Sequence, residues 1–279
     1  MISDTKVVAI GGGTGLSTML KGLKLHTHNI TAVVTVADDG GSSGILRSDL
    51  GMLAPGDVRN CVSALAEVDP VMGELLNFRF KDGSLKGHSL GNLFLAALNE
   101  TSSSFDEAVK KFSHLTGVVG TVYPVTNESV TLSALLEDGR LIEGESHIGV
   151  HHDGPKNGIV KLMVNPEKPK AVDGVIKALE KADIIVLGPG SLYTSIIPNL
   201  LVDGVVDAIK KSNAVKIYVC NIMSQAGETE NYTVSDHLAA IERHSYEGIA
   251  DIVIANNAII PESLRIKYAS EHAREVMID

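Results

Sequence analysis

The stretch "VVAIGGGTGLSTMLKGLKL", Val7 to Leu25, decides the fold. It begins with a β-branched run, Val7 to Ile10, passes through the glycine turn Gly11 to Gly15, and ends in a segment whose apolar residues recur at helical spacing. A second apolar run, Ile30 to Val36, follows after a few residues. The order strand, glycine turn, helix, strand predicts a βαβ unit with a right-handed crossover, as found in parallel sheets covered by helices.

The rest of the chain continues this alternation. Asp57 and either Ser104 or Asp106 are expected N-caps of helices, and further strands are expected in ADIIVLGPGS, AVKIYVCNIM and ADIVIANNAI. Helical patterns are expected at about 57–67, 70–79, 90–100 and 105–115. We therefore predict an α/β protein with a doubly wound, mostly parallel, Rossmann-like sheet, forming a single domain over residues 1–279.

Residues 118–165 have a different pattern of apolar and polar residues. Apolar and polar residues alternate there around the turn pair Asp138-Gly139, which favours a β-hairpin. We predict a small antiparallel β segment inserted into the α/β domain. Within it, His151 to Asp153 is expected to be a solvated turn rather than a metal site. His147 and His151 have H-x-x-x-H spacing, but on a strand they would lie roughly 13 Å apart, too far to share one ion.

Composition excludes several classes of function. The formal net charge is −10 and the sequence pI is near 5.5, so nothing favours duplex nucleic acid as a partner. Cys61 and Cys220 form no CxxC motif, which gives no sign of a disulfide framework or a zinc site. No apolar run approaches the roughly 18 residues of a membrane helix, and no signal peptide is recognisable. We expect a cytoplasmic protein with no membrane or nucleic-acid partner.

Polar loops follow the predicted strands, and this placement indicates a binding crevice. In open α/β sheets, ligands bind outside the carboxyl ends of the strands. The turn Gly11 to Gly15 offers backbone N–H groups at the start of a helix, which suits a phosphate. Its match to G-x-G-x-x-G fails at Leu16, and no P-loop Lys-Ser/Thr follows. Nucleotide binding and a merely tight turn therefore remain alternatives for this motif alone.

The run "ADDGGSSG" after the second strand is the next candidate. Asp38 and Asp39 lie where a carboxylate commonly accepts a hydrogen bond from a ribose or positions a cation, although they can also serve as a turn pair. Adjacent side chains of an extended backbone point to opposite faces, so we expect different roles for the two. Arg47 and Arg59 are candidate anion ligands, and Asn60 is a candidate for a sugar or a base.

Three further polar loops complete the predicted crevice. GHSLGN (Gly87 to Asn92) leads into an apolar helix, LGPGSLYTS (Leu187 to Ser195) follows a strand, and CNIMSQAGET contains Asn221. Each also has a plain structural reading as a helix cap or rigid turn. No G-x-S-x-G elbow and no recognisable Ser/His/Asp arrangement is present.

Together these motifs resemble the gluconeogenesis factor family (YvcK-like proteins). The resemblance rests on IGGGTGLSTMLKGLK, TVADDGGSSGILRSDLG with PGDVRNC, GHSLGN, LGPGSLYTSIIPNLLV and VCNIMSQAGETENYTVSDHL, and it covers almost the whole chain. This family is similar in fold to the CofD-type 2-phospholactate transferases. The resemblance implies a Rossmann-like fold, a bacterial cytoplasmic protein, binding of UDP-sugars such as UDP-N-acetylglucosamine, and a role in cell shape and cell-wall maintenance during gluconeogenic growth.

Motif by motif, the resemblance and the loop positions give one set of expected ligand-binding residues. It comprises Gly11, Gly12, Gly13, Thr14 and Gly15 of the phosphate turn; the acidic pair Asp38 and Asp39; Asn60, His88, Ser89 and Asn92; Gly188, Gly190, Ser191 and Tyr193 of the second glycine loop; Asn221; and Tyr232 as a sugar contact.

Three functions are weighed on this basis. The first is a UDP-sugar-binding regulatory protein in which the loop from Asp39 to Gly56 orders on binding and alters a surface for a protein partner. We expect such a protein to form a homo-oligomer and to have no established catalytic activity. The second is a CofD-like phosphotransferase or nucleotidyl transferase, with Mg²⁺ near Asp38 or Asp39. The third is an NAD-binding enzyme, because NAD also presents a diphosphate.

Overall fold

The centre of the protein is a six-stranded parallel sheet with the order β3-β2-β1-β7-β8-β9. This computed structural model describes residues 3–150 and 158–279. The predicted Rossmann-like class is confirmed. The strands are β1 (Val7–Gly11), β2 (Ile30–Val34), β3 (Thr121–Pro124), β7 (Ile184–Leu187), β8 (Val215–Val219) and β9 (Ile252–Ile254).

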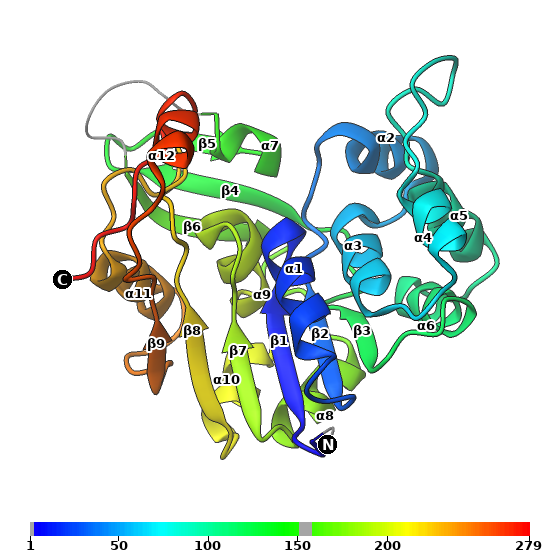
Figure 1. The fold of residues 1–279 in the computed structure, drawn as a ribbon, viewed down its shortest axis with the longest axis horizontal. Coiled ribbons are helices and arrows are strands. Elements are labelled where there is room, and N and C mark those ends of the chain that lie inside the picture. Colours follow the sequence, from blue (N-terminus) through cyan, green and yellow to red (C-terminus); the bar gives the residue numbers. More distant parts are fainter. Residues whose placement is uncertain (1–2, 151–157) are drawn as a thin grey trace.

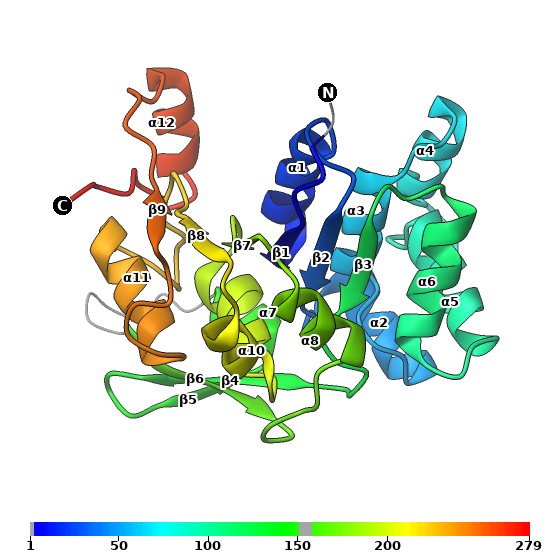
Figure 2. The same ribbon diagram turned by 90° about the horizontal axis from the view of Figure 1, so that it is seen from below.

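The opening βαβ unit forms as the sequence indicates. Strand β1 is buried along its whole length and pairs with β2 on one side and β7 on the other. Helix α1 (Gly13–Leu23) buries Leu16 and Leu20, which lie one turn apart on one face. In Figure 2, α1 lies on one side of the sheet together with α3.

Five helices connect β2 to β3: α2 (Gly41–Leu50), α3 (Gly56–Leu65), α4 (Pro70–Asn77), α5 (Leu90–Glu100) and α6 (Phe105–Leu115). Ser104 caps α6 by accepting a hydrogen bond from the Glu107 N–H, as expected. Two expectations are wrong. Most of the Asp39–Gly56 loop is helix α2, whose buried Ser42, Ser43 and Leu46 anchor it. Asp57 is not the N-cap of α3, because the helix begins one residue earlier, after Pro55.

The inserted β segment is a three-stranded antiparallel sheet of order β5-β4-β6. It consists of β4 (Thr131–Leu136), β5 (Leu141–Glu143) and β6 (Ile159–Asn165), with the short helix α7 (Glu145–Ile148) after β5. The Asp138-Gly139 turn joins β4 to β5, with Gly139 at a φ of 85°. The segment starts later than predicted, because β3 pairs in parallel with β2 in the main sheet. The predicted turn at His151 to Asp153 lies outside the described residues.

The C-terminal half supplies the other helices. They are α8 (Asp173–Glu180), the π-helical turn η1 (Leu192–Ile196), α9 (Ile197–Leu200), α10 (Val205–Lys211), α11 (Val234–Arg243) and α12 (Glu262–Ala269). Helices α8 and α10 lie on the side of the sheet opposite α1, and the three-stranded sheet lies on that same side (Figure 2). Within the described part of the chain, no helix combines the length and apolar character needed to cross a bilayer.

The strand order reverses between β1 and β7, and the backbone there is unusually close-packed. A Cβ atom added to Gly15 would lie 2.8 Å from the carbonyl oxygen of Pro189 and 3.2 Å from the Gly190 nitrogen. The start of α1 therefore rests directly on the Gly188–Gly190 turn after β7. The carboxyl ends of the strands point toward the top of Figure 1, where β4 and α7 also lie.

This contact gives a direct test of what holds the two halves of the sheet together. Gly15→Ala should destabilise the protein by about 1–3 kcal/mol, because the methyl group has to displace the Pro189 backbone. Gly22→Ala in the same helix is the matched control, since an added Cβ there meets nothing within 4 Å. The control should stabilise by about 0.5–1 kcal/mol through reduced chain entropy. Urea unfolding measures both, and equal effects of the two substitutions would contradict the packing role.

Candidate functional site

A cavity of about 420 Å³ lies at the carboxyl ends of the strands, beside the point where the strand order reverses. It is formed by the loops after β1, β2, β7 and β8 together with α3 and α7. Its lining residues are Gly13, Asp38, Asp57, Glu145, Ser146, Gly149, Val150, Ser191, Thr194, Ser195, Gln225 and Glu228. Ligands of open α/β proteins bind at this position, so we identify this cavity as the candidate site.

The two glycine turns bring backbone to the cavity. A Cβ atom on Gly12 would lie 2.6 Å from the Asp57 carboxylate, and one on Gly190 would lie 3.3 Å from the Gly12 carbonyl oxygen. Gly13 has a φ of 65°, a conformation that side chains disfavour. The predicted phosphate turn thus exposes main chain at a position that a larger residue would block. Gly13 and Ser191 line the cavity directly.

Asp57 is the main residue that sequence reasoning missed. Its carboxylate faces Gly12 and Gly13 from the first turn of α3, where it was expected to act only as a cap. Burial raises the pKa of Asp57 to about 6, the nearby Asp38 carboxylate adds to this, and a hydrogen bond from the Gly13 backbone opposes it. The motif PGDVRNC gave a clue, because it belongs to the same acidic, glycine-rich stretch as Asp38.

Asp38 and Asp39 have different surroundings, in line with their alternation along the chain. Both oxygens of Asp39 accept backbone hydrogen bonds from α7, from Glu145 N at 2.9 Å and Ser146 N at 2.8 Å. Asp38 accepts one hydrogen bond, from Gly40 N at 2.9 Å, and lines the cavity. Asp39 therefore holds the inserted segment in place, and Asp38 is the member of the pair that faces the cavity.

Two glutamates complete a cluster of four carboxylates. Burial, followed by the charges of Asp38 and Asp39, raises the pKa of Glu145 to about 8. Burial also raises the pKa of Glu228 to about 7, although it accepts hydrogen bonds from Tyr193 N, Thr194 Oγ1 and Gln225 Nε2. None of the described residues that line the cavity is positively charged.

The two arginines predicted as anion ligands bind protein groups instead. Arg47 donates to the carbonyl oxygens of Ala37, Asp38 and Val130, at 3.0, 3.1 and 2.7 Å. Arg59 is buried and donates to Asn92 Oδ1 at 3.3 Å and Asn77 Oδ1 at 2.8 Å. Neither lines the cavity. Arg47 therefore fixes the backbone of the acidic loop, and Arg59 ties α3 to α4 and α5.

The GHSLGN motif forms a buried support behind the cavity. His88 Nδ1 lies 2.9 Å from Ser42 Oγ, which also accepts a hydrogen bond from Asn92 Nδ2 at 3.1 Å. Ser89 is the N-cap of α5. These groups connect α5 to the start of α2, so the structure places His88, Ser89 and Asn92 behind the acidic loop rather than on the surface of the cavity. Asn60 lies partly exposed on α3.

The remaining predicted residues divide between contacts and core. Asn221 holds the second glycine loop, with its Nδ2 donating to the Gly190 carbonyl oxygen at 2.8 Å. Tyr193 is fully buried, and its hydroxyl lies 2.9 Å from that of Tyr232. The carbonyl oxygen of Thr14 accepts hydrogen bonds from Ser17 and Thr18 within the first turn of α1. The side chains of Asn221, Tyr193 and Thr14 do not line the carboxylate cavity.

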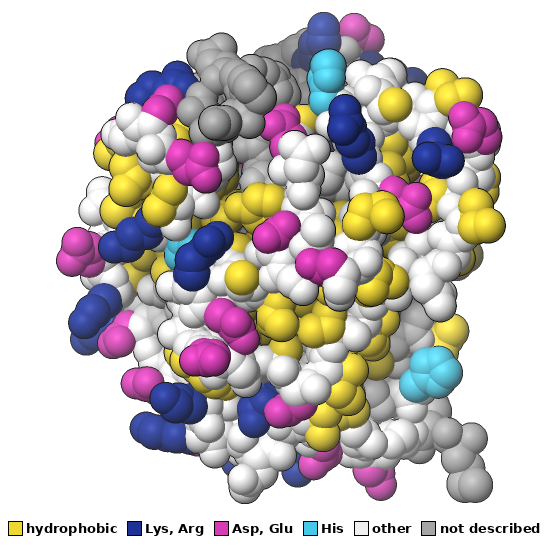
Figure 3. All heavy atoms as spheres, turned by 90° about the vertical axis from the view of Figure 1, so that its left-hand side faces the viewer, with side chains coloured by type: hydrophobic (Ala, Val, Ile, Leu, Met, Phe, Trp, Pro, Cys, Tyr) yellow, Lys and Arg dark blue, Asp and Glu magenta, His cyan; other side chains and the backbone are white. Residues whose placement is uncertain are grey.

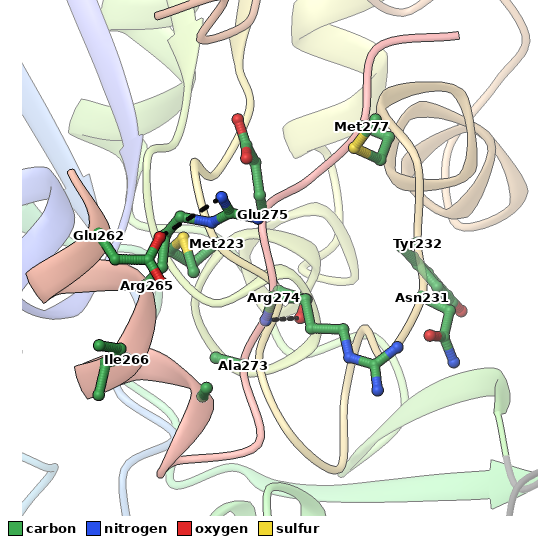
Figure 4. Close-up of a pocket in the computed structure, with 12 residues that line it drawn as sticks. Met223, Asn231, Tyr232, Glu262, Arg265, Ile266, Ala273, Arg274, Glu275 and Met277 are labelled. Atoms are coloured by element: carbon green, nitrogen blue, oxygen red, sulfur yellow. Dashed lines mark hydrogen bonds and ion pairs between the residues drawn. The ribbon is translucent and has the colours of Figure 1, made fainter. Parts of the chain in front are cut away.

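Tyr232 instead borders a second, larger cavity of about 620 Å³, between α12 and the C-terminal residues (Figure 4). There, Tyr232 and Asn231 lie on one side, and Arg265 on the other side pairs with Glu262 at 3.7 Å. This cavity is remote in sequence from the glycine turns and lacks the carboxylate cluster. We place the candidate site in the smaller cavity because the glycine turns and four ionisable groups converge there.

Comparison with known proteins identifies the family of this chain. The family model described as 2-phospho-L-lactate transferase CofD matches residues 7–279. A putative gluconeogenesis factor of Thermoanaerobacterium thermosulfurigenes is 53% identical, over 100% of this chain and 86% of the relative. The chain belongs to the gluconeogenesis factor family and carries a CofD-like domain. The gluconeogenesis factor of Bacillus subtilis is 46% identical, over 98% of this chain and 86% of its own length.

Other relatives of this gluconeogenesis factor family member are longer. The chain spans 62% of the putative gluconeogenesis factor of Clostridium acetobutylicum, to which it is 51% identical over its whole length. A crystal structure of a UPF0052 family protein from Bacillus halodurans superposes with a TM-score of 0.96 at 45% identity, covering 100% of this chain and 89% of that one. These comparisons confirm both the family predicted from the motifs and the predicted fold.

The raised pKa of Asp57 makes stability depend on pH in a predictable direction. A carboxyl whose pKa is higher in the folded than in the unfolded protein binds more protons when folded between the two values. The free energy of unfolding therefore falls as the pH rises from about 4 through about 6. Asp57→Asn should remove this part of the fall and raise the free energy of unfolding at pH 8 by roughly 1–3 kcal/mol.

Denaturant unfolding at pH 5 and pH 8 measures this effect. Asp82→Asn, in an exposed bend, is the matched control and should leave the difference between the two pH values unchanged. The interpretation of Asp57 is wrong if wild type and Asp57→Asn lose the same stability between pH 5 and pH 8.

Proposed function

We propose that this gluconeogenesis factor family member binds a UDP-sugar, such as UDP-N-acetylglucosamine, together with a divalent cation in the carboxylate cavity. The observation that carries the proposal is the pairing of exposed glycine backbone with facing carboxylates at the reversal of strand order. Backbone N–H groups at the start of α1 suit the phosphates. Hydroxyl and carboxylate groups around them suit the sugar and the ribose.

The negative charge of the cavity requires the cation. A diphosphate brought next to Asp38, Asp57, Glu145 and Glu228 would meet only carboxylates and neutral groups among the described lining residues. The pKa of Asp57 is raised first by burial and then by the Asp38 carboxylate, and the charge of Arg59 offsets only a small part of this rise. A divalent cation between these carboxylates and the phosphates would offset both charges.

Magnesium fits this set of residues. Mg²⁺ is usually bound by one or two carboxylates together with phosphate oxygens and water. Asp38 and Asp57 offer that number, whereas Asp39 does not, since both of its oxygens accept hydrogen bonds from α7. Among the described residues no group of three or more His, Cys, Asp or Glu side chains could hold a metal by itself, so the proposal requires phosphate oxygens of the nucleotide as further ligands. When bound, Mg²⁺ neutralises phosphate charge.

We propose a regulatory role, in cell shape and cell-wall maintenance during growth on gluconeogenic carbon sources. Support comes from the family, whose members are named gluconeogenesis factors. Ligand binding would act on α7, because Glu145 lines the cavity while Asp39 holds the first turn of that helix. Ligand binding would then alter the surface of the inserted sheet, and a protein partner would recognise that surface rather than the expected Asp39–Gly56 loop.

A second candidate function is transfer of a phosphorus-containing group, as the name of the matching family model suggests. The observation that favours it is the same pair, Asp38 and Asp57, since metal-bound carboxylates assist phosphoryl chemistry. Release of nucleoside phosphate from a nucleotide-activated phospho-acid, dependent on Mg²⁺ and lost in Asp38→Asn, would establish it. NAD is a third ligand with a diphosphate between two riboses and serves as the competitor in the same assays.

Calorimetry tests the main proposal. UDP-N-acetylglucosamine should bind in the presence of Mg²⁺ and at least ~10-fold more weakly in EDTA, because the unscreened carboxylates repel the diphosphate. Asp38→Asn and Asp57→Asn should abolish the difference between Mg²⁺ and EDTA, and Asp82→Asn should retain it. Tighter binding of NAD than of UDP-N-acetylglucosamine, or no binding of either, would refute the assignment.

A further inference from the structure

One face of the β7-β8-β9 half of the main sheet is apolar and uncovered. In the parallel register, Ile184 lies beside Val215, Val186 beside Ile217, Ile217 beside Ile252, and Val219 beside Ile254. Neighbouring residues in register point to the same side of a sheet. We call this set the open face: Ile184, Val186, Val215, Ile217, Val219, Ile252 and Ile254.

Exposure differs sharply between the two faces of the same strands. On the open face, Val215, Ile252 and Ile254 are 43%, 48% and 51% exposed. On the opposite face, Ile185, Leu187 and Tyr218 are all 0% exposed. Parallel sheets normally have both faces buried, and β1 and β2 in this sheet follow that rule. The open face is therefore the part of the core surface that lacks its second layer.

The figures show why this half lacks cover. Figure 1 looks onto this face, with α1 in front of the β1 and β2 half. Helix α12 lies on the same side of the sheet as α1, beyond the carboxyl ends of β8 and β9, and no helix of residues 3–150 or 158–279 lies in front of the strands β7, β8 or β9 themselves. Helices α10 and α11 lie behind these strands, because the crossovers from β7 to β8 and from β8 to β9 run on that side (Figure 2). Figure 3 shows hydrophobic side chains gathered near the middle of the side that carries β9.

We propose that the open face binds an amphipathic α-helix supplied by a polypeptide segment outside residues 1–279. A helix is the element that covers a parallel sheet in this class of fold, and its apolar stripe matches a strip three strands wide. Relatives contain polypeptide beyond the region that this chain matches, since this chain accounts for 62% of one relative and 86% of two others. The occupant to which we commit is a helix of that origin, placed beside α1.

A second copy of this chain fits less well. Stable dimers bury about 800 Å² on each partner. Only three of the seven side chains of the open face are exposed, and the other four are already partly or fully covered. This strip is small for a subunit interface and suits one helix. The site is also separate from the carboxylate cavity, with which it shares no residue.

The test uses the 279-residue chain and a peptide with the sequence of the Thermoanaerobacterium thermosulfurigenes relative that lies outside the matched region. We expect the peptide to bind, to gain helical circular dichroism, and to protect amides of 215–219 and 252–254 from hydrogen exchange. The double variant Ile252→Lys/Ile254→Lys should weaken binding at least ~10-fold, since docking would bury two charges. Ile259→Lys, at a side chain 93% exposed outside the open face, should leave binding unchanged.

A second variant, Val215→Lys, tests the face from the other end of β8 and keeps the result interpretable if the double variant unfolds. Analytical ultracentrifugation of the chain alone completes the experiment. The proposal is overturned if the peptide does not bind, or if it binds equally well to both lysine variants. It is also overturned if the chain forms a dimer that Val215→Lys dissociates, because a second copy would then occupy the open face.

Discussion

The close approach of two glycine turns across β1 and β7 is the contact on which the rest of the site depends. Gly15 rests on the carbonyl of Pro189, and Gly12 lies close to Gly190. Side chains at these positions would push the two halves of the sheet apart. With the two turns held together in this way, the Gly13 backbone and the carboxylates of Asp38 and Asp57 line one cavity. The arrangement depends on the absence of side chains at Gly12 and Gly15 rather than on the chemistry of any side chain.

The role of each acidic residue in the cavity follows from the groups that donate hydrogen bonds to its carboxylate. Asp39 has two backbone donors from α7 and is a structural group. Glu228 is fully buried, and burial raises its pKa although Tyr193, Thr194 and Gln225 donate hydrogen bonds to it. Asp38 and Asp57 have fewer donors and face open space. Acidic residues thus have different roles within one small volume. Asp39 anchors α7, Glu228 forms part of the cavity wall, and Asp38 and Asp57 are the candidate ligand-binding groups.

Much of the fold was predictable from local pattern. The βαβ unit follows from a β-branched run, glycines and helical periodicity, and helices α5 and α6 begin and end where their patterns do. The site was harder. Nothing local distinguishes Asp57 from an ordinary helix cap, because its role arises from Gly12 lying against it across the fold. Likewise Arg47 and Arg59 look like anion ligands in sequence, and only the packed structure shows carbonyl and amide oxygens already occupying their donors.

Helix α2 illustrates the same limit. Its sequence, GSSGILRSDL, has the composition of a loop, and tertiary burial of Ser42, Ser43 and Leu46 makes it helical. The carboxylate cluster has one more consequence. Burial raises the pKa values of Glu145 and Glu228 to about 8 and about 7, so both groups hold protons near neutral pH and would lose them to a dication that binds as proposed. Cation binding in this cavity would then be coupled to proton release, and the affinity of the cavity for the cation would rise with pH.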